Sequence, residues 1–321
     1  MFSKEYLIKL SETTGFKPDS LQRQMTLIEL LREVNRHPLL GKQYVLKGGT
    51  AINLFWFPLP RLSVDIDLNY IGSSNRETML RERPTLEEEI KKLIKAKGIT
   101  VENAPAKEHA GGKWRLRAPN AFGGSFTVEL DLNYIMRTPV WGAEIKRPYS
   151  LDDDYLFECR VLSFEELFAG KCKALLDRSA ARDLYDAHKL SKELVEYDKS
   201  KLRKTLTLFG LTCIDDWRKK DFSTIDEINL RMIDQELTPL LRLDEPINLE
   251  KMKAEVKVFL TGLMKYDKNE KLFIDRFLDN GVYEPELIFD EAEKVEELRH
   301  HPALLWKLKN HREHLGLDRK T

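Results

Sequence analysis

The sequence is poor in cysteine and has no excess charge of either sign. Its 321 residues contain three cysteines, Cys159, Cys172 and Cys213, whose odd number and wide spacing provide neither a disulfide framework nor a zinc-binding pattern. Lysine and arginine together number 53, as do aspartate and glutamate, so the net charge is zero. The chain therefore lacks an overall positive field, and any binding of nucleic acid requires a local basic patch.

Long apolar segments are also absent. No apolar run approaches the roughly 18 residues that a membrane-spanning helix needs, and the N-terminal "MFSKEYLIKLSETTG" lacks the apolar core of a signal peptide. The Walker lysine motif, the G-x-S-x-G motif and the protein-kinase signatures are missing as well. We therefore expect a soluble, cytoplasmic protein with no membrane partner.

The hydrophobic pattern changes character near the middle of the chain. Residues 20–36 and 76–97 have helical spacing, and residues 63–70 and 125–135 alternate as strands do. From Ser163 onward the pattern is mostly helical. The sequence thus predicts an α/β domain over residues 1–150 and a mainly helical domain over residues 151–321, with Ser20 and Thr50 as helix caps.

Two of the predicted strands carry acidic residues on one face. Residues two apart on a strand share a face, at a separation of about 6.5–7 Å. "SVDIDLNY" therefore places Asp65, Asp67 and Asn69 together. "TVELDLNY" repeats the pattern with Glu129, Asp131 and Asn133. In both strands the opposite face is apolar.

Close carboxylates repel one another unless a cation lies between them, and magnesium, which prefers carboxylate and phosphate oxygens, suits such a pair. An isolated D-x-D pattern is usually only a solvated strand face. Here, however, Gly48 and Gly49 end one strand and open a helix just before the first acidic strand. Glycines in such a turn allow backbone amides to approach a phosphate. If the two acidic strands are neighbours, a third carboxylate joins the first two.

These motifs resemble a known family. A strand, a "GG[ST]" turn, a helix, a D-x-D strand and a later acidic strand form the pattern of polymerase-β-like nucleotidyltransferases. Four blocks resemble the AbiEii toxins of abortive-infection and type IV toxin–antitoxin systems, to which the mycobacterial MenT toxins are related. They are "LKGGTAINLF…RLSVDIDLNY", "VELDLNYIMRTPV", "SFEELFAGKCKALLDRSAARDLYDAHKL" and "FIDRFLDNGVYEPELIF…HPALLWKLKN".

The resemblance implies an α+β fold: a mixed sheet with flanking helices, followed by a helical C-terminal domain that completes the nucleotide site. It assigns two Mg²⁺ ions to Asp65, Asp67 and Asp131, although Glu129 is a second acid on the third strand and either could reach metal. Lys171 and Asp186 are further catalytic candidates. The residues assigned to nucleotide binding are Gly48, Gly49, Thr50, Lys171, Arg182 and Asp183.

The implied function is that of a toxin that transfers a nucleoside monophosphate from an NTP to an acceptor hydroxyl. Relatives imply the tRNA 3′ end as the acceptor, arrested translation and growth as the result, and a separate AbiEi-like antitoxin that need not form a stable complex. Two alternatives are a kinase-like toxin that phosphorylates protein and a non-catalytic nucleotide-binding module. Intact acids at every expected position argue against the second alternative.

Several of these residues also have purely structural interpretations. "RSAAR" favours a turn between two helices, in which Lys171, Arg182 and Asp186 could form a salt bridge instead of a nucleotide site. The basic runs at 201–204, 217–220 and 307–314 could contact RNA, but charged helix faces are usually only solvated. Trp56, Trp141 and Trp306 are expected in the core.

Overall fold

The computed structural model describes residues 2–105, 110–149, 151–192 and 196–317. Two compact units make up the chain. The first comprises Met1–Ser163 with Asp234–Ile247, and the second comprises Phe164–Ile233 with Asn248–Thr321. The domain division expected at residues 150/151 stays a prediction. None of the described helices is long and apolar enough to cross a membrane.

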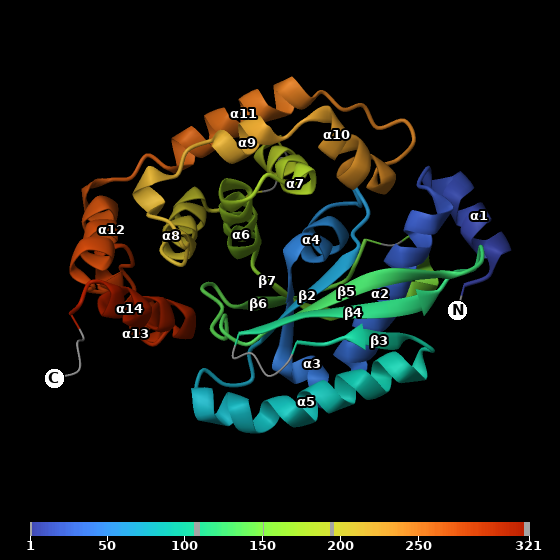
Figure 1. Cartoon of the computed structure of the whole chain (residues 1–321), viewed down its shortest axis with the longest axis horizontal. Helices are drawn as coiled ribbons and strands as arrows, with labels where there is room; N and C mark the ends of the chain where they lie inside the picture. Colours follow the sequence, from blue (N-terminus) through green and yellow to red (C-terminus); the bar gives the residue numbers. More distant parts are fainter. Residues whose placement is uncertain (1, 106–109, 150, 193–195, 318–321) are drawn as a thin grey trace. The chain divides into compact units, whose positions relative to one another are not determined.

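The first unit is built on a mixed seven-stranded sheet with the strand order β3-β4-β5-β2-β1-β7-β6 (Figure 1). The strands are β1 (Tyr44–Lys47), β2 (Asp65–Tyr70), β3 (Thr100–Asn103), β4 (Gly111–Pro119), β5 (Ser125–Asn133), β6 (Ala143–Lys146) and β7 (Cys159–Leu162). The helices and helical turns are α1 (Lys4–Thr14), α2 (Pro18–Arg36), α3 (Leu40–Gln43), α4 (Gly48–Ala51), η1 (Ile52–Trp56), α5 (Arg76–Ala96), η2 (Asp153–Tyr155) and η5 (Thr238–Leu240), with η4 (Ile233–Leu237) at the unit boundary.

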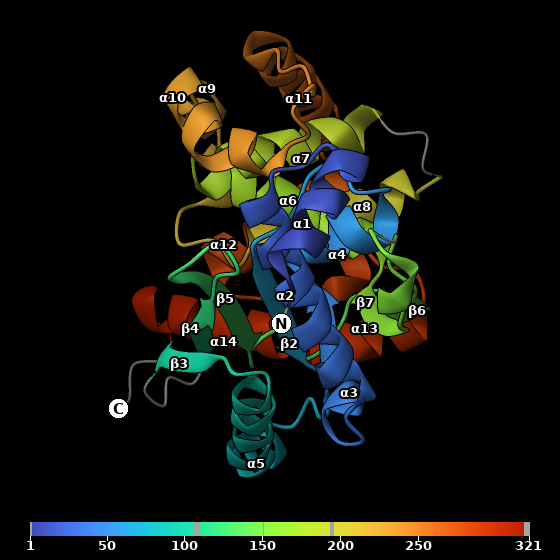
Figure 2. The same cartoon turned by 90° about the vertical axis from the view of Figure 1, so that its right-hand side faces the viewer.

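Alternation of apolar and polar residues gives this sheet one buried face. Ile66 and Leu68 of β2 are 2% and 1% exposed, and the apolar positions of β4 and β5 are buried in the same way. Helix α5 covers this face, since Arg83 stacks on the ring of Tyr134 and Lys91 on that of Trp114. Helix α5 also runs beside β3, as Figure 1 and Figure 2 show. The polar face of β2 and β5 is left for the acidic residues.

Several local expectations for this unit were wrong. Ser20 is not a cap, because α2 begins at Pro18 and the Ser20 hydroxyl donates to the carbonyl of Pro239. Thr50 is not a cap either, because it lies inside α4, which begins at Gly48. The segment "EHAGGKW" could also be taken for a loop from its glycines, but its residues 111–114 belong to β4 and its residues 108–109 lie outside the described residues. The first acidic strand begins at Asp65 rather than Ser63.

The second unit is helical, as the pattern after Ser163 predicts. Its elements are α6 (Phe164–Asp177), α7 (Ala181–Lys192), α8 (Lys199–Gly210), η3 (Trp217–Lys219), α9 (Ser223–Glu227), α10 (Leu230–Met232), α11 (Leu249–Leu263), α12 (Lys268–Asn280), η6 (Pro285–Leu287), α13 (Ala292–Arg299) and α14 (Pro302–His314). Helices α6 and α7 pack side by side after a short turn, which confirms the helical hairpin expected at "RSAAR". Together with the sheet of the first unit, these helices confirm the predicted α+β class.

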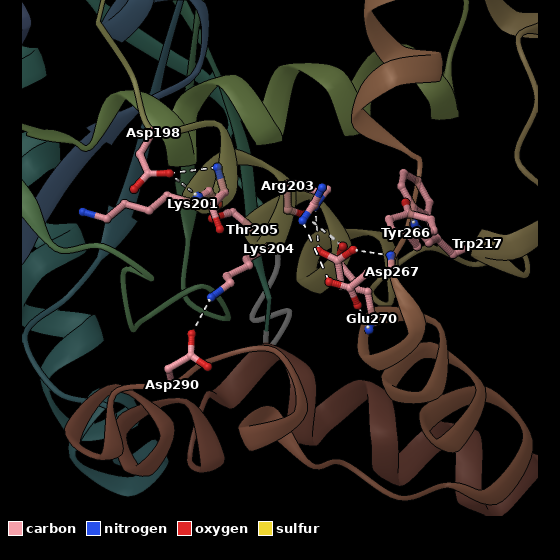
Figure 3. A network of polar contacts seen from close by, with 12 residues as sticks. Asp198, Lys201, Arg203, Lys204, Thr205, Trp217, Tyr266, Asp267, Glu270 and Asp290 are labelled. Carbon is pink, nitrogen blue, oxygen red and sulfur yellow. Dashed lines mark hydrogen bonds and ion pairs between the residues drawn. The ribbon is translucent and has the colours of Figure 1, made fainter.

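Two basic runs of this unit are engaged in ion pairs. In the first run, Arg203 donates to the buried carboxylate of Glu270 over 2.7 Å, and Lys204 lies 3.2 Å from Asp290 (Figure 3). Arg218, in the second run, forms ion pairs with Asp216, Asp275 and Asp279. These cations therefore have anionic partners within the fold, which favours the structural interpretation of both runs.

The tryptophan expectation was wrong for Trp306, which is 55% exposed on α14. Trp56 and Trp141 are half-buried. The tryptophans that do lie in cores are Trp114 and Trp217, at 2% and 1% exposure. Trp114 alternates with exposed cations on β4, and Trp217 donates its indole N–H to Tyr266 over 2.8 Å.

Candidate active site

The glycine turn lies directly against the first acidic strand. Strand β1 ends at Lys47, and Gly48 then adopts a φ of +75°, a left-handed conformation that glycine tolerates best. A Cβ atom at Gly48 would lie 1.9 Å from Oδ2 of Asp67. Only the absence of a side chain at Gly48 allows the Asp67 carboxylate to occupy this position.

The sheet register places charged residues of four strands in one row. Lys47 of β1 pairs with Asp67 of β2, Asp67 pairs with Asp131 of β5, and Asp131 pairs with Lys113 of β4. Residues in register on adjacent strands share a face of the sheet. The row therefore has two carboxylates at its centre and a lysine at each end.

A second row lies one pleat step along the strands. Asp65 of β2 pairs with Glu129 of β5, and Glu129 pairs with Arg115 of β4. The Lys113 ammonium crosses from the first row to donate to Glu129 over 2.8 Å, and this bond raises the pKa of Lys113. The expectation that the acidic strands are neighbours is thus confirmed, and each acid of β5 lies beside one acid of β2.

The surroundings of Asp131 favour its protonated form. Its carboxyl group is half-buried, and this burial is the main cause that raises its pKa. The negative charges of Asp67 and Glu129 raise it further, whereas Lys47 and Lys113 oppose the rise. A carboxylate with a raised pKa is a better proton acceptor than an ordinary one.

Thr50 links the glycine turn to the start of strand β2. Its side chain is 1% exposed, its hydroxyl lies 2.7 Å from that of Ser63, and it donates to the backbone carbonyl of Asp65. These bonds link α4 to the first residue of β2. The Thr50 hydroxyl is therefore placed to position Asp65, and its assignment to nucleotide binding stays a prediction.

The acid rows suit a hard divalent cation. Their donors are carboxylate oxygens, Asp67 and Asp131 lie on adjacent strands, and the pKa of Asp131 records repulsion that a cation would relieve. Among the described residues, no three acidic, histidine or cysteine side chains are already gathered as a complete metal cage. Magnesium does not need one, because it is commonly held by one or two carboxylates together with substrate phosphates.

The second group of candidates forms a buried ion cluster in the second unit. The ammonium of Lys171, on α6, lies 2.7 Å from Asp183 and 2.8 Å from Asp186, both on α7. All three side chains are nearly inaccessible, at 9%, 1% and 1% exposure. Arg178 lies in the turn between the two helices, and two of its guanidinium nitrogens lie 2.8 Å from Oδ2 of Asp183.

Two cations thus balance two carboxylates in this cluster. Burial alone would raise the pKa of Asp183, but the positive charges of Lys171 and Arg178 outweigh it and hold that pKa far below its usual range. The salt bridge considered from the sequence exists between Lys171 and Asp186, with Asp183 as a further partner. Arg182 lies half-buried in the first turn of α7.

Four charged residues of these groups were not identified from the sequence. Lys47 and Lys113 lie at the two ends of the first row, Arg115 lies at the end of the second row, and Arg178 binds Asp183. The signal for Lys113 was available in "KWRLR", whose cations alternate with apolar residues as on an exposed strand. Nothing in the sequence alone could fix the register that sets Lys113 beside Asp131.

Comparison with known proteins found a matching family model and a similar solved structure. The sequence model of a family described as "Nucleotidyl transferase AbiEii toxin, Type IV TA system" matches residues 29–279. Among solved structures, the chain is similar to MenT4, a nucleotidyltransferase toxin from Mycobacterium tuberculosis H37Rv, with a TM-score of 0.65 and 17% identity. That alignment covers 96% of this chain and 99% of the other, and at this identity it shows a common fold. No curated protein matches the sequence.

Proposed function

Since the chain belongs to the AbiEii family of nucleotidyltransferase toxins of type IV toxin–antitoxin systems, we propose that it transfers a nucleoside monophosphate from an NTP to the 3′ hydroxyl of a tRNA. Pyrophosphate is the leaving group, and the modified tRNA no longer supports translation. The observation that carries this proposal is the position of Asp67, whose carboxylate lies against Gly48 and which pairs in register with Asp131. A row of carboxylates beside a glycine turn offers places for both metal and triphosphate.

Asp65, Asp67 and Asp131 would hold Mg²⁺, two ions in the form we favour. When bound, magnesium supplies positive charge to the reacting phosphate and to the leaving pyrophosphate. Gly48 and Gly49 give the triphosphate close access to the backbone, while Gly48 also leaves room for the Asp67 carboxylate. Thr50 fixes the start of β2 and so positions Asp65.

Asp131 is the residue that we assign to the acceptor. Its half-buried carboxyl group pairs in register with Asp67, and a carboxylate beside the proposed metal-binding pair is suited to take the proton from the attacking hydroxyl. Glu129, one pleat step away, is bound to Lys113 instead. This ion pair supports the choice of Asp131, which the resemblance already favours.

Lys171, Arg182, Asp183 and Asp186 form the second part of the proposed machinery. Asp183 and Asp186 hold the Lys171 ammonium in one place, and a fixed ammonium is a suitable partner for a phosphate. Arg182 could add a forked contact to the same anion. An antitoxin related to the AbiEi regulators would oppose the toxin without having to bind it stably.

The test is mass spectrometry of the acceptor after incubation with NTP, Mg²⁺ and tRNA. We expect tRNA to gain the mass of a nucleoside monophosphate, and Asp67→Ala to abolish this gain and the growth arrest while the protein stays folded. Loss of one metal-binding carboxylate removes charge stabilisation worth several kcal/mol. A gain of one phosphate on protein would instead show a kinase-like toxin and contradict the proposal.

A further inference from the structure

Strand β4 presents a row of positive charge beside the acids. Lys113, Arg115 and Arg117 alternate with Trp114 and Leu116 along the strand. The two apolar side chains are 2% and 0% exposed, whereas the three cations are exposed on the opposite face. We call Lys113, Arg115 and Arg117 the cationic stripe.

The stripe begins at the candidate catalytic row and runs away from it. Its side chains occupy the same face as the acids of β5, because they are in register with residues on that face. Consecutive members are separated by about 6.5–7 Å, two residues of an extended strand. The register pairs are Lys113 with Asp131, Arg115 with Glu129, and Arg117 with Thr127.

The cations of the stripe are accessible to a ligand. The side chains of Lys113 and Arg117 are 59% and 57% exposed, although they form ion pairs with Glu129 and Glu102. Ion pairs as exposed as these contribute little to stability and exchange readily for another anion. Arg115 has no acidic partner within ion-pairing distance among the residues that the structure describes.

We propose that the cationic stripe binds successive phosphates of a single-stranded RNA segment and directs its terminal 3′ hydroxyl toward Asp131. This inference rests on the proposed function, in which the acceptor is an RNA. An evenly spaced row of cations on a rigid strand complements the regular phosphates of an extended nucleic-acid backbone. Such charged tracks bind single strands without reading their sequence.

Other basic segments of the chain are less suited to this role. Arg203 is bound to the buried Glu270, and Arg218 is shared among three aspartates. Displacement of Arg203 would leave the buried Glu270 carboxylate uncompensated, and Arg218 would have to release three carboxylates. The carboxylates that pair with the stripe, Glu129 and Glu102, have side chains that are 30% and 24% exposed, and the stripe is in register with the acids of β5.

The test is the salt dependence of binding to a short single-stranded RNA of mixed sequence, measured by fluorescence anisotropy without NTP. Each phosphate contact contributes about 0.7 to the slope of log K against log salt for single strands. At about 0.1 M salt, the loss of one contact should therefore weaken binding about fivefold. We expect Arg115→Gln to reduce the magnitude of the slope by about 0.7. Neutralisation of all three cations should reduce it about three times as much.

Arg81→Gln is the matched control, since Arg81 is an exposed arginine of α5, the helix that covers the other face of the sheet. It should leave the affinity and the slope unchanged, and Arg115→Lys should recover most of the binding. Equal binding by wild-type protein and the triple variant would overturn the inference. The inference would also be overturned if the wild-type protein, but not the triple variant, bound a polyglutamate peptide and neither bound RNA. The stripe would then be a binding surface for an acidic protein.

Transfer of nucleotide to the same RNA, measured in parallel, separates the two proposals. If the wild-type protein and the triple variant transfer nucleotide equally well and bind RNA equally well, the proposed role of the stripe is wrong and the proposed function stands. If the wild-type protein modifies only protein hydroxyls, both the role of the stripe and the proposed function are wrong. Transfer by wild-type protein, with a raised KM for RNA and an unchanged KM for NTP in the triple variant, supports the stripe.

Discussion

Gly48→Ala tests whether the glycine turn exists to make room for Asp67. The added methyl carbon would lie 1.9 Å from Oδ2 of Asp67, 2.8 Å from its Cγ and 3.1 Å from its Cβ. Because ordinary contacts between heavy atoms begin near 3.5 Å, the carboxylate oxygen has to retreat by about 1.5 Å. Gly48 has a φ of +75°, so alanine also adds backbone strain of about 1–2 kcal/mol.

The displacement should cost far more in rate than in stability. A magnesium–oxygen bond of about 2.0–2.1 Å does not stretch to follow such a movement. Misplacement of a reacting group by about 1 Å can slow an enzyme about 100-fold. We therefore expect Gly48→Ala to reduce the rate of nucleotide transfer at least about 100-fold, equivalent to about 2.7 kcal/mol of transition-state stabilisation.

Gly98→Ala is a closely matched control. Gly98 has a φ of +70°, but a Cβ atom there would have no neighbour within 4 Å. Both variants carry the same kind of backbone strain, so both should lose a similar amount of unfolding free energy in urea titrations. Only Gly48→Ala should lose transfer activity in initial-rate assays. A Gly48→Ala protein with the wild-type rate would refute the link between the turn and Asp67.

Four further variants test the assignments of individual residues. Asp131→Asn should lower the transfer rate by orders of magnitude and Glu129→Gln should cost little; the opposite ranking would move the third acid to Glu129. Asp131→Asn should also raise the melting temperature of the metal-free protein at neutral pH, because burial, followed by the charge of Asp67, raises the pKa of Asp131 and penalises its charged form. Because the pKa of Asp131 is raised in the folded protein, the cost of its charged form increases as the pH rises through that pKa. The increase in melting temperature should therefore vanish below about pH 4, where the carboxyl group is protonated in the unfolded protein too. Lys171→Ala should reduce the unfolding free energy by about 3–5 kcal/mol, because two buried carboxylates lose their shared cation. It should also weaken NTP binding in calorimetric titrations, with Lys171→Arg restoring only part; normal nucleotide affinity would make the cluster purely structural.

The sequence predicts most strongly where periodicity and glycine act together. Alternation in "VDIDLNY" and "VELDLNY" is sufficient to identify two strands and their acidic faces, because each residue type has only one favourable side of a half-buried sheet. The side on which Asp65 and Asp67 lie follows from the burial of Ile66 and Leu68. The family blocks are equally informative, and the fold class that they imply is the one observed.

Local patterns do not predict the register of paired strands or the ion-pair partners of charged side chains. That β5 pairs in parallel with β2, with Asp131 opposite Asp67, depends on strands more than 60 residues apart finding one another. The sequence suggests a salt bridge among Lys171, Arg182 and Asp186. In the structure Asp183 also shares the Lys171 ammonium, and Arg178 is the second cation of the cluster. Helical spacing places Asp183 and Asp186 on one face, but only the packing of α6 on α7 decides which side chains meet.

The same limit applies to helix caps and tryptophans. Thr50 and Ser20 are good cap residues by type, but the helices begin two residues earlier and their hydroxyls bind elsewhere in the unit. Trp306 is large and apolar, yet it lies on an exposed surface of the terminal helix α14. The type of a residue gives it a preference for a cap position or for the core, but its neighbours in the folded protein determine whether it takes that position.

The central claim is that this chain moves a nucleotide onto RNA, and labelled substrates test it most directly. Wild-type protein and the Asp67→Ala variant would be incubated with total tRNA, Mg²⁺ and each NTP in turn, labelled at either the α- or the γ-phosphate. We expect α-label from at least one NTP to become attached to tRNA, γ-label to leave as pyrophosphate, and Asp67→Ala to transfer neither label. Attachment of γ-label to RNA or protein, or transfer that survives the loss of Asp67, would contradict it.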